Sequence, residues 1–468
     1  MHNDLTLRRQ FIILIMIVTA GITIRLIYHQ VVLGFGGEFD HGSDTGKYVK
    51  PALALLEFGR IGIVTAEHEV VPNFGRMPMY SWFLAGVFKI FGASNYLAVV
   101  TIQAFVDGMT ILFVGMSAWA IKRRWALTAA ILAALLPNLI SHTAWVLTEV
   151  LFLMFFSAGI AATLWAIRGQ WRVVLLIGAG IGFGLALMTR PVLIFFPVVL
   201  YPLLFICLWQ TSNVPYRKAL ALSILPIIAM LACVTPRLLD TYMLYGKPVL
   251  TTQSGAHALK WVIPCLKVPW TCGSMPEDWQ RNKPIVESRL ALLGEDAQEN
   301  PVVLDMIKRQ LAAERLREMP LSKITIGMVA GMTRNLIQSS FYHITSQLKQ
   351  PNTFLSAMPG SGIQEKLLNF LDTNRTNPMM WLWGIAHLAL GLSRLVQLAG
   401  IFGGLTGRST WPVSLLLSGI LTYFLVVSGP IGNAKYRMPM EPILILYTLW
   451  GVEIIQALRH KLRHRQTT

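Results

Sequence analysis

Residues 11–33 read FIILIMIVTAGITIRLIYHQVVL, and residues 38–49, which follow shortly, read EFDHGSDTGKYV. A helix of about 20 apolar residues spans the ~30 Å hydrocarbon core of a bilayer, so the first run predicts a transmembrane helix. The second run places Asp44, with Asp40 and two glycines nearby, at the mouth of that helix. A carboxylate held at a membrane is costly unless it has a function, so we expect chemistry here.

The rest of the chain has the composition of a multi-span membrane protein. It is 54% apolar and 13% charged, whereas soluble domains carry about 25% charged residues. We therefore expect an all-α polytopic membrane protein of about ten transmembrane helices, with surface helices in the first external loop and a mixed external segment. The expected spans are 11–33, 95–118, 126–142, 147–167, 173–189, 192–209, 219–235, 381–404, 411–428 and 438–457.

The net charge of +17 is spread over alternate short loops, which argues against a nucleic-acid partner. Loops rich in Lys and Arg are typically cytoplasmic, which predicts that both termini are cytoplasmic. In contrast, 18 of the 23 acidic residues fall within 34–79 and 236–380, so we expect the active site on the external face of an inner or plasma membrane. The basic groups are Arg8/Arg9, Lys122–Arg124, Arg168/Arg172, Arg217/Lys218, Arg408 and the tail 459–465.

Three parts are expected along the chain. Residues 1–235 form an N-terminal transmembrane catalytic module, which includes the external loop 34–94. Residues 236–380 form the external segment, and residues 381–468 form the last transmembrane helices with a basic tail.

Apolar residues at helical spacing predict two helices that lie along the external surface, near 47–59 and 79–92. In the external segment, 301–319 is predicted to be a charged surface helix and 321–341 an amphipathic one.

No cofactor is indicated by a phosphate-binding loop, a His-Cys metal spacing or a serine-nucleophile motif, and a metal requirement stays open. Glu67, His68 and Glu69 could bind a metal, but neighbours in an extended stretch face opposite sides, which favours a solvated acidic loop. Cys265 and Cys272 share the external segment, where an oxidising compartment would allow a disulfide; two free thiols are the alternative.

Polar residues gather at the predicted external ends of the helices. Cations there could hold an anionic lipid head group, because Arg matches phosphate with two hydrogen bonds. A carboxylate could accept the proton of an incoming hydroxyl. Displacement of a sugar from a lipid phosphate needs both parts. The candidate residues are Asp40, Asp44, Lys47, Tyr48, Arg76, Glu149, Arg190, Arg237, Lys435, Tyr436 and Arg437.

Simpler roles compete for some polar residues. Arg25, near the end of the first span, is expected to extend to the interface, as long cationic side chains often do. Glu149 could instead stabilise a helix N-terminus. Asp107 lies in mid-span and is expected to pair with a neighbouring helix. The large loop is expected to begin at Arg237.

Taken in order, these motifs resemble those of membrane glycosyltransferases of GT-C fold that use a polyprenyl-phosphate sugar. Relatives include the dolichyl-phosphate-mannose protein mannosyltransferases and the bacterial lipid A aminoarabinose transferases. The likeness covers about 1–260 and 380–457. The matching motifs are SDTGKYVKPALALLEFGR, RMPMYSWFLAGVFKIFG, TEVLF, MTRPV, TPRLLDTYMLYGKPVLTTQSGAH and AKYRMPMEPILIL.

The resemblance implies that Asp44 is the catalytic base and that Arg76, Arg190 and Arg437, with Lys435, line the donor phosphate site. It implies a polyprenyl-phosphate-linked sugar as donor, a membrane lipid, glycan or protein as acceptor, and the bilayer itself as a partner. The chain departs from the family where Thr45 replaces an acidic residue and where Lys435 replaces a more usual Arg.

Only one carboxylate, Asp44, is well supported as a catalytic group, which favours direct displacement with inversion at the anomeric carbon. A retaining route would need Asp40 as a second carboxylate. A lipid-linked polysaccharide ligase or polymerase is one alternative, but its cations would be expected in a late large loop. A flippase or transporter of lipid-linked sugars is the other, and it should show inverted repeats and charge at mid-depth.

Overall fold

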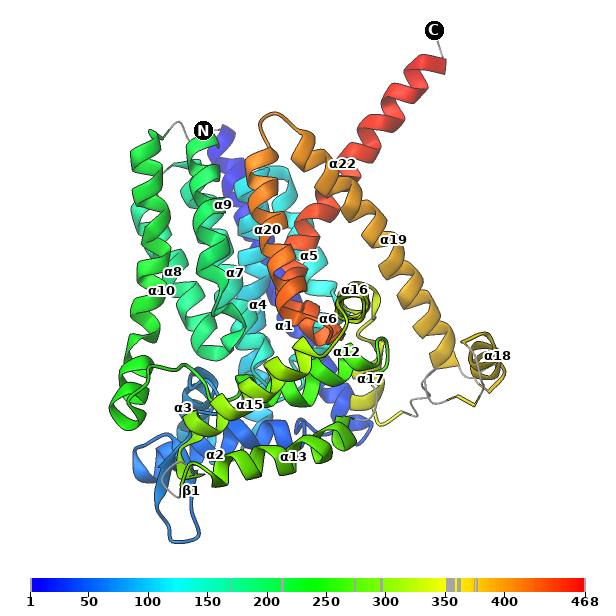
Figure 1. Cartoon of the computed structure of the whole chain (residues 1–468). Coiled ribbons are helices and arrows are strands. Elements are labelled where there is room, and N and C mark those ends of the chain that lie inside the picture. The colour runs from blue at the N-terminus through cyan, green and yellow to red at the C-terminus, as the bar shows by residue number, and fades with distance from the viewer. Residues whose placement is uncertain are drawn as a thin grey trace.

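The computed structural model is a helical bundle whose one end is covered by shorter helices (Figure 1). We call these shorter helices the cap. Both termini lie at the opposite end of the bundle, which we call the basic end. The structure describes residues 2–169, 171–211, 214–272, 275–294, 298–350, 358–359, 363–373, 375 and 378–466.

Eight helices in the described part of the chain are long and apolar enough to cross a membrane, so the chain is an integral multi-pass membrane protein. They coincide with eight of the expected spans, although several are longer. They are α1 (His2–Gly34), α4 (Tyr96–Ile121), α7 (Glu149–Arg168), α8 (Arg172–Thr189), α10 (Tyr216–Tyr245), α19 (Pro378–Thr406), α20 (Trp411–Ser428) and α22 (Glu441–Gln466).

The other two expected spans differ from the prediction. The span 126–142 is broken into α5 (Ala126–Leu135) and α6 (Pro137–His142), because Pro137 has no N–H to donate to the carbonyl of Ala133. The span 192–209 becomes a short 3₁₀ turn followed by α9 (Phe196–Thr211), whose 16 residues fall short of the bilayer's ~30 Å at 1.5 Å per residue.

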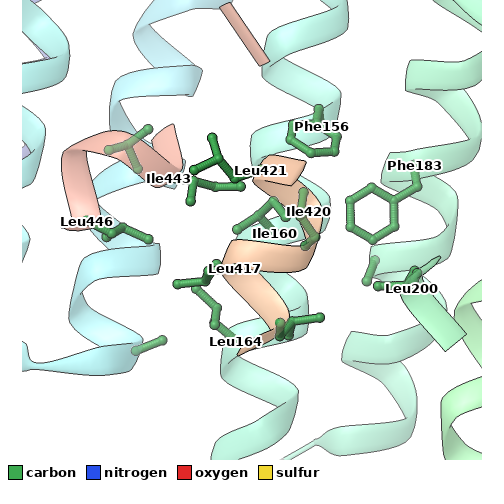
Figure 2. Close-up of a cluster of buried hydrophobic side chains, with 14 of the residues drawn as sticks. Phe156, Ile160, Leu164, Phe183, Leu200, Leu417, Ile420, Leu421, Ile443 and Leu446 are labelled. Carbon is green, nitrogen blue, oxygen red and sulfur yellow. The ribbon is translucent and has the colours of Figure 1, made fainter. Parts of the chain in front are cut away.

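The core of the bundle is a set of interlocked aromatic and branched side chains from α7, α8, α9, α20 and α22 (Figure 2). Lipid tails are as apolar as these side chains, so van der Waals packing and close helix approach hold such a core together. Gly180 of α8 shows the close approach, because a Cβ there would lie 2.3 Å from the carbonyl oxygen of Pro226 on α10. The labelled residues are Phe156, Ile160, Leu164, Phe183, Leu200, Leu417, Ile420, Leu421, Ile443 and Leu446.

Arg25 does not extend to the interface, so that expectation is wrong. Its side chain is fully buried and pairs with Asp107 of α4, which was expected to pair with a neighbouring helix. Its Nη1 also donates to the Gly21 and Ala134 carbonyls at 2.9 Å, and its Nη2 donates to the carbonyl of Ala133 at 3.3 Å. The helix break before Pro137 frees the Ala133 carbonyl, and Arg25 satisfies it.

The first loop contributes two helices to the cap, as predicted: α2 (Ser43–Phe58) and α3 (Met79–Phe91). Between them the chain forms a hairpin of two antiparallel strands, β1 (Gly62–Val64) and β2 (Val70–Pro72), which was not predicted.

The rest of the cap comes from the external segment, and Cys265 and Cys272 form a disulfide within it. The segment starts later than expected, because α10 continues to Tyr245 and keeps Arg237 inside the helix. Its helices are α11 (Ser254–His257), η3 (Ala258–Val262), α12 (Ile263–Lys267), α13 (Met275–Ala291), α15 (Pro301–Arg317), α16 (Leu321–Ile337), α17 (Phe341–Gln347) and α18 (Ile363–Thr373). Three of these helices, η3, α13 and α15, share a small core around Leu259 and Ile307.

The basic end is joined by a shared carboxylate. Glu453 of α22 accepts hydrogen bonds from Lys122, Arg124 and the indole of Trp125, the last at 2.6 Å. These contacts tie the last helix to the α4–α5 connection.

The charge distribution predicts which end faces outward, and labelling can test it. In cells that express a Gln280→Cys variant, whose new thiol lies on exposed α13 of the cap, a membrane-impermeant maleimide should label the protein. A Lys218→Cys variant, exposed at the basic end, should label only after detergent permeabilisation. Both variants should carry Cys207→Ser and Cys233→Ser, which remove the two free thiols. Labelling of position 218 but not of position 280 in intact cells would show that the protein has the opposite orientation in the membrane.

Candidate active site

Asp44 lies in the first turn of α2. The two glycines do not prevent this helix, but Gly42, with a φ of +64°, keeps it from reaching back to Asp40. Thr45 fixes the helix start: its buried hydroxyl accepts from the His41 N–H at 2.9 Å and donates to the Val146 carbonyl at 3.1 Å. The residue that departs from the family pattern therefore anchors α2 to the turn before α7.

Two cations contact the Asp44 carboxylate directly. Lys47 Nζ lies 2.7 Å and Arg76 Nη2 3.4 Å from Oδ1, and the Asp44 side chain remains 38% exposed. Burial would raise the pKa of Asp44, but Lys47, Lys435 and Arg76 outweigh it and hold that pKa below its ordinary value. Asp44 is thus an ionised carboxylate that an incoming group can reach.

Arg76 is held in place by the backbone around it. Arg237, buried in α10, donates from Nη2 to the carbonyl oxygens of Arg76 at 3.0 Å and Asn73 at 3.4 Å. Its guanidinium also lies 3.9 Å from the centre of the Phe74 ring. Within the described residues, the Arg76 Nε is buried and has no hydrogen-bond partner. This N–H is a free cationic donor, which suits an anionic ligand.

A second charged group lies where α7, α8 and the last span meet. Glu149 opens α7, Arg190 follows α8, and Lys435 belongs to the short helix α21 (Ala434–Arg437). Both cations contact the same carboxylate oxygen, Glu149 Oε1, with Lys435 Nζ at 3.0 Å. Glu149 is only 2% exposed, whereas each cation is 21% exposed. The buried carboxylate of Glu149 therefore positions two cations that remain partly accessible to solvent.

These charges line a small pocket of about 20 Å³, enough for roughly one water molecule. Phe152, Val192 and Phe424 form part of its apolar wall, and Tyr436 lies beside Lys435 at its polar side.

The two charged groups are close to each other. Lys435 lowers the pKa of Asp44, and the ring of Tyr48 lies 5.5 Å from the Arg76 guanidinium. Burial raises the pKa of Tyr48, while the charges of Arg76 and Arg190 act to lower it. Cations from three separate parts of the chain thus surround one region beside Asp44.

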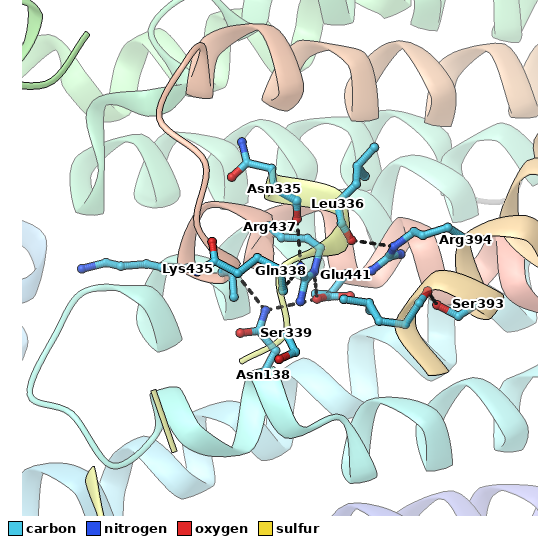
Figure 3. A network of polar contacts seen from close by, with 12 residues as sticks. Asn138, Asn335, Leu336, Gln338, Ser339, Ser393, Arg394, Lys435, Arg437 and Glu441 are labelled. Carbon is cyan, nitrogen blue, oxygen red and sulfur yellow. Dashed lines mark hydrogen bonds and ion pairs between the residues drawn. The ribbon is translucent and has the colours of Figure 1, made fainter. Parts of the chain in front are cut away.

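Arg437 points elsewhere. It is 1% exposed, and its Nε lies 2.6 Å from Glu441 Oε1. Its Nη1 donates to the carbonyls of Asn335 at 2.8 Å and Gln338 at 2.6 Å. In Figure 3 the Lys435 side chain extends away from this network. The contacts of Arg437 join α21 to α16 and α22, so they favour a structural role over the phosphate contact expected from the sequence.

Asp40 also stays apart from Asp44. Its exposed carboxylate accepts the Gly42 N–H at 2.8 Å, which is a local turn contact. Sequence reasoning gave no role to His41 or His257, although both lie near the charged groups. His257 is in a motif that the resemblance included, and a lone histidine in a loop gives no sequence signal of its own.

Residues 72–234 match a family model described as dolichyl-phosphate-mannose-protein mannosyltransferase, which confirms the resemblance over this range. No curated protein matches the chain in sequence. The matched range includes Arg76, Glu149 and Arg190, whereas Asp44 and Lys435 lie outside it.

Solved structures with a similar fold include the oligosaccharyltransferase of Archaeoglobus fulgidus. Its apo form matches with a TM-score of 0.53 at 13% identity, over 97% of this chain and 51% of that one. The archaeal oligosaccharyltransferase AglB from Archaeoglobus fulgidus, in complex with an inhibitory peptide and a dolichol-phosphate, matches with a TM-score of 0.51 at 12% identity, over 96% of this chain and 51% of that one. ArnT from Cupriavidus metallidurans bound to undecaprenyl phosphate gives a TM-score of 0.40 at 14% identity, over 94% and 77%. This chain spans about half the length of the archaeal enzyme, and the two archaeal matches show a shared GT-C fold.

Proposed function

We propose that this chain, a membrane protein of GT-C fold, is a glycosyltransferase that moves a sugar from a polyprenyl-phosphate donor to an acceptor hydroxyl on the external membrane face. One observation carries the proposal: the accessible carboxylate of Asp44 lies beside several cations, and one of them, Arg76, has a buried N–H without a partner among the described residues. A base and a phosphate site side by side are what this reaction needs.

Each group has a defined part in the reaction. Asp44 takes the proton from the acceptor hydroxyl as its oxygen bonds to the anomeric carbon. The bond from that carbon to the phosphate oxygen breaks, and its electron pair leaves with the polyprenyl phosphate. Arg76, Arg190 and Lys435, with Lys47 at the rim, stabilise the charge that develops on the phosphate. Arg237, Tyr48 and Tyr436 support these cations without contacting the reacting atoms.

Inversion at the anomeric carbon is the expected outcome. A retaining enzyme needs a nucleophilic carboxylate about 5 Å from a partner acid. Asp40 is the nearest candidate in sequence, but it lies before α2, and its carboxylate accepts a hydrogen bond from the Gly42 N–H. Asp44 therefore has the stronger claim as the single base.

Transport of a lipid-linked sugar has less support. A transporter of this kind would carry accessible charge at mid-depth. The mid-span charges Arg25 and Asp107 are fully buried and pair with each other, which is typical of a helix joint.

The direct test offers the purified protein a panel of polyprenyl-phosphate hexoses and pentoses. Release of polyprenyl phosphate, followed by mass spectrometry, should occur with one donor class and should depend on an acceptor extract from the membrane. A protein that consumes none of them and fails to bind undecaprenyl phosphate would contradict the proposal.

Arg76→Gln should weaken the binding of undecaprenyl phosphate by about 10- to 100-fold. The reason is that a charged hydrogen bond is worth about 1.5–3 kcal/mol and 1.4 kcal/mol is a factor of ten. Affinity can be measured by titrating the solubilised protein, and the melting temperature should stay close to that of the wild type. Arg60→Gln, which changes an exposed arginine of the same loop, is the matched control and should bind normally. Equal loss in both variants would point to a general charge effect.

A further inference from the structure

His257 ends α11 on the side of the cap contributed by the external segment. The chain just before it is bonded to the loop that carries Arg76: the Thr252 N–H donates to the Phe74 carbonyl at 3.0 Å, and the Thr251 hydroxyl donates to the Gly75 carbonyl at 3.3 Å. These contacts fix the position of α11 relative to Arg76.

The other side of α11 is fixed as well. Asp305 of α15 accepts the Ser254 hydroxyl and the Gly255 N–H, both at 2.7 Å, and also pairs with Arg309. Held on two sides, α11 presents His257 with an exposed side chain.

Arg76 and Arg190 are the charges that act on His257. Atoms packed around the ring lower the pKa of His257 first by partial desolvation, although the side chain keeps access to solvent, and the two guanidinium groups lower that pKa further. The free imidazole is therefore harder to protonate than an ordinary histidine. The contacts of Thr251 with Gly75 and of Thr252 with Phe74 place α11 beside the loop that carries Arg76, one of the cations that contact Asp44.

The other charged groups around α11 have partners of their own. Asp305 is held by Ser254, Gly255 and Arg309. Lys260 and Lys308 lie over the Trp279 ring, at 4.2 Å and 5.8 Å from its centre.

An anion bound between Arg76 and Arg190 would reverse the charge that His257 experiences. We propose that His257 is the acid of this site: it takes up a proton when a lipid phosphate binds and gives that proton to the phosphate as the sugar leaves. This inference rests on the proposed function and extends it, because it assigns a group to the leaving phosphate and brings the external segment into the active site.

The proton balance is complete. The donor phosphodiester carries one negative charge, and the departing polyprenyl phosphate would carry two. His257 donates a proton to the phosphate oxygen that leaves the anomeric carbon, and Asp44 accepts the proton of the acceptor hydroxyl. After release, Asp44 loses its proton to water and His257 is neutral again. The net reaction moves one proton from the acceptor to the phosphate.

The test measures protons, not turnover. Undecaprenyl phosphate is titrated calorimetrically into the solubilised full chain in two buffers of different ionisation enthalpy at pH 7.5. The lipid's own second ionisation, with a pKa of about 6, contributes equally to every variant. For each lipid molecule bound, the wild type should take up roughly half a proton or more in addition to the number that His257→Gln takes up. At pH 6.5 the wild type should bind roughly tenfold more tightly than His257→Gln, as expected for one charged hydrogen bond, and at pH 8.5 the two should bind alike.

Two further variants sharpen the result. His257→Lys supplies a fixed cation, so it should bind at pH 8.5 more tightly than wild type and without extra proton uptake. His68→Gln, which changes an exposed histidine of the β1–β2 hairpin, should match wild type. Equal proton uptake by wild type and His257→Gln would overturn the inference while leaving the phosphate site intact. A wild type that does not bind undecaprenyl phosphate would overturn the proposed function itself.

Discussion

Asp44→Asn should lower sugar transfer by about 10²- to 10⁴-fold, the range expected for the loss of general-base catalysis. The substitution keeps the shape of the side chain and the N-terminal turn of α2 but removes the group that accepts the acceptor proton. Binding of undecaprenyl phosphate should survive, because Arg76, Arg190 and Lys435 remain. The measurement is the initial rate of polyprenyl-phosphate release from the donor that the wild type consumes, together with lipid affinity.

Asp40→Asn is the matched control for Asp44→Asn. It changes a carboxylate four residues away whose hydrogen bond in the described structure is to the Gly42 N–H of its own turn, so transfer should stay within a few-fold of wild type. The anomeric configuration of the product gives an independent check. Near-normal turnover by Asp44→Asn, or a product that keeps the donor's configuration, would exclude the inverting mechanism.

The low pKa of Asp44 has a consequence for the pH dependence of transfer. Because Lys47, Lys435 and Arg76 hold this pKa below its ordinary value, Asp44 stays ionised throughout the neutral and mildly acidic range. A loss of rate between pH 5 and 7 would therefore have another origin. A carboxylate of such low pKa is a weak base, but a bound phosphate would draw Lys47 and Arg76 away from it. The pKa of Asp44 would then rise as the donor binds, and the base would strengthen when it is needed.

The sequence was informative about which residues share a side of the membrane. Hydropathy identified the long spans, and the charge of the loops assigned Asp44, Arg76, Glu149, Arg190 and Lys435 to the same side. The structure shows these residues in two groups, Asp44 with Arg76 and Glu149 with Arg190 and Lys435. They come together because each lies at an element end or in a loop at the same end of the bundle.

What the sequence could not predict were the partners of individual charges. Arg437 and Lys435 are two residues apart in one motif, yet they have different partners. The Arg437 side chain binds Glu441 and backbone carbonyls, whereas the Lys435 side chain pairs with Glu149. Arg25 resembles a residue that would extend to the interface, and only the break before Pro137 gives it internal acceptors. Such outcomes depend on packing between distant segments, which periodicity and charge counts do not encode.

Arg25→Met should destabilise the protein by about 3–5 kcal/mol, the cost of leaving one partner of a buried ion pair uncompensated. Asp107 is fully buried, and its second oxygen already lacks a hydrogen-bond partner among the described residues, so loss of the guanidinium would leave a buried carboxylate without its opposite charge. The Ala133 carbonyl would also lose its donor. The measurement is the midpoint of unfolding by a denaturing detergent, followed by tryptophan fluorescence.

The double variant Arg25→Met/Asp107→Leu separates the lost pair from general damage to the core. Replacing both charges with apolar side chains of similar size removes the uncompensated carboxylate, and such replacements of buried pairs are often neutral or stabilising. The recovery should be large but incomplete, because the freed carbonyls near Pro137 would still lack the donors that Arg25 supplied. A single variant as stable as wild type, or a double variant no better than the single, would show that the pair is not what joins α1, α4 and α5. The printed contacts of this pair lie within α1, α4 and α5 and include none of the charged groups around Asp44. The double variant should therefore also keep its affinity for undecaprenyl phosphate, which would assign the pair to folding and leave the chemistry to the cap end of the bundle.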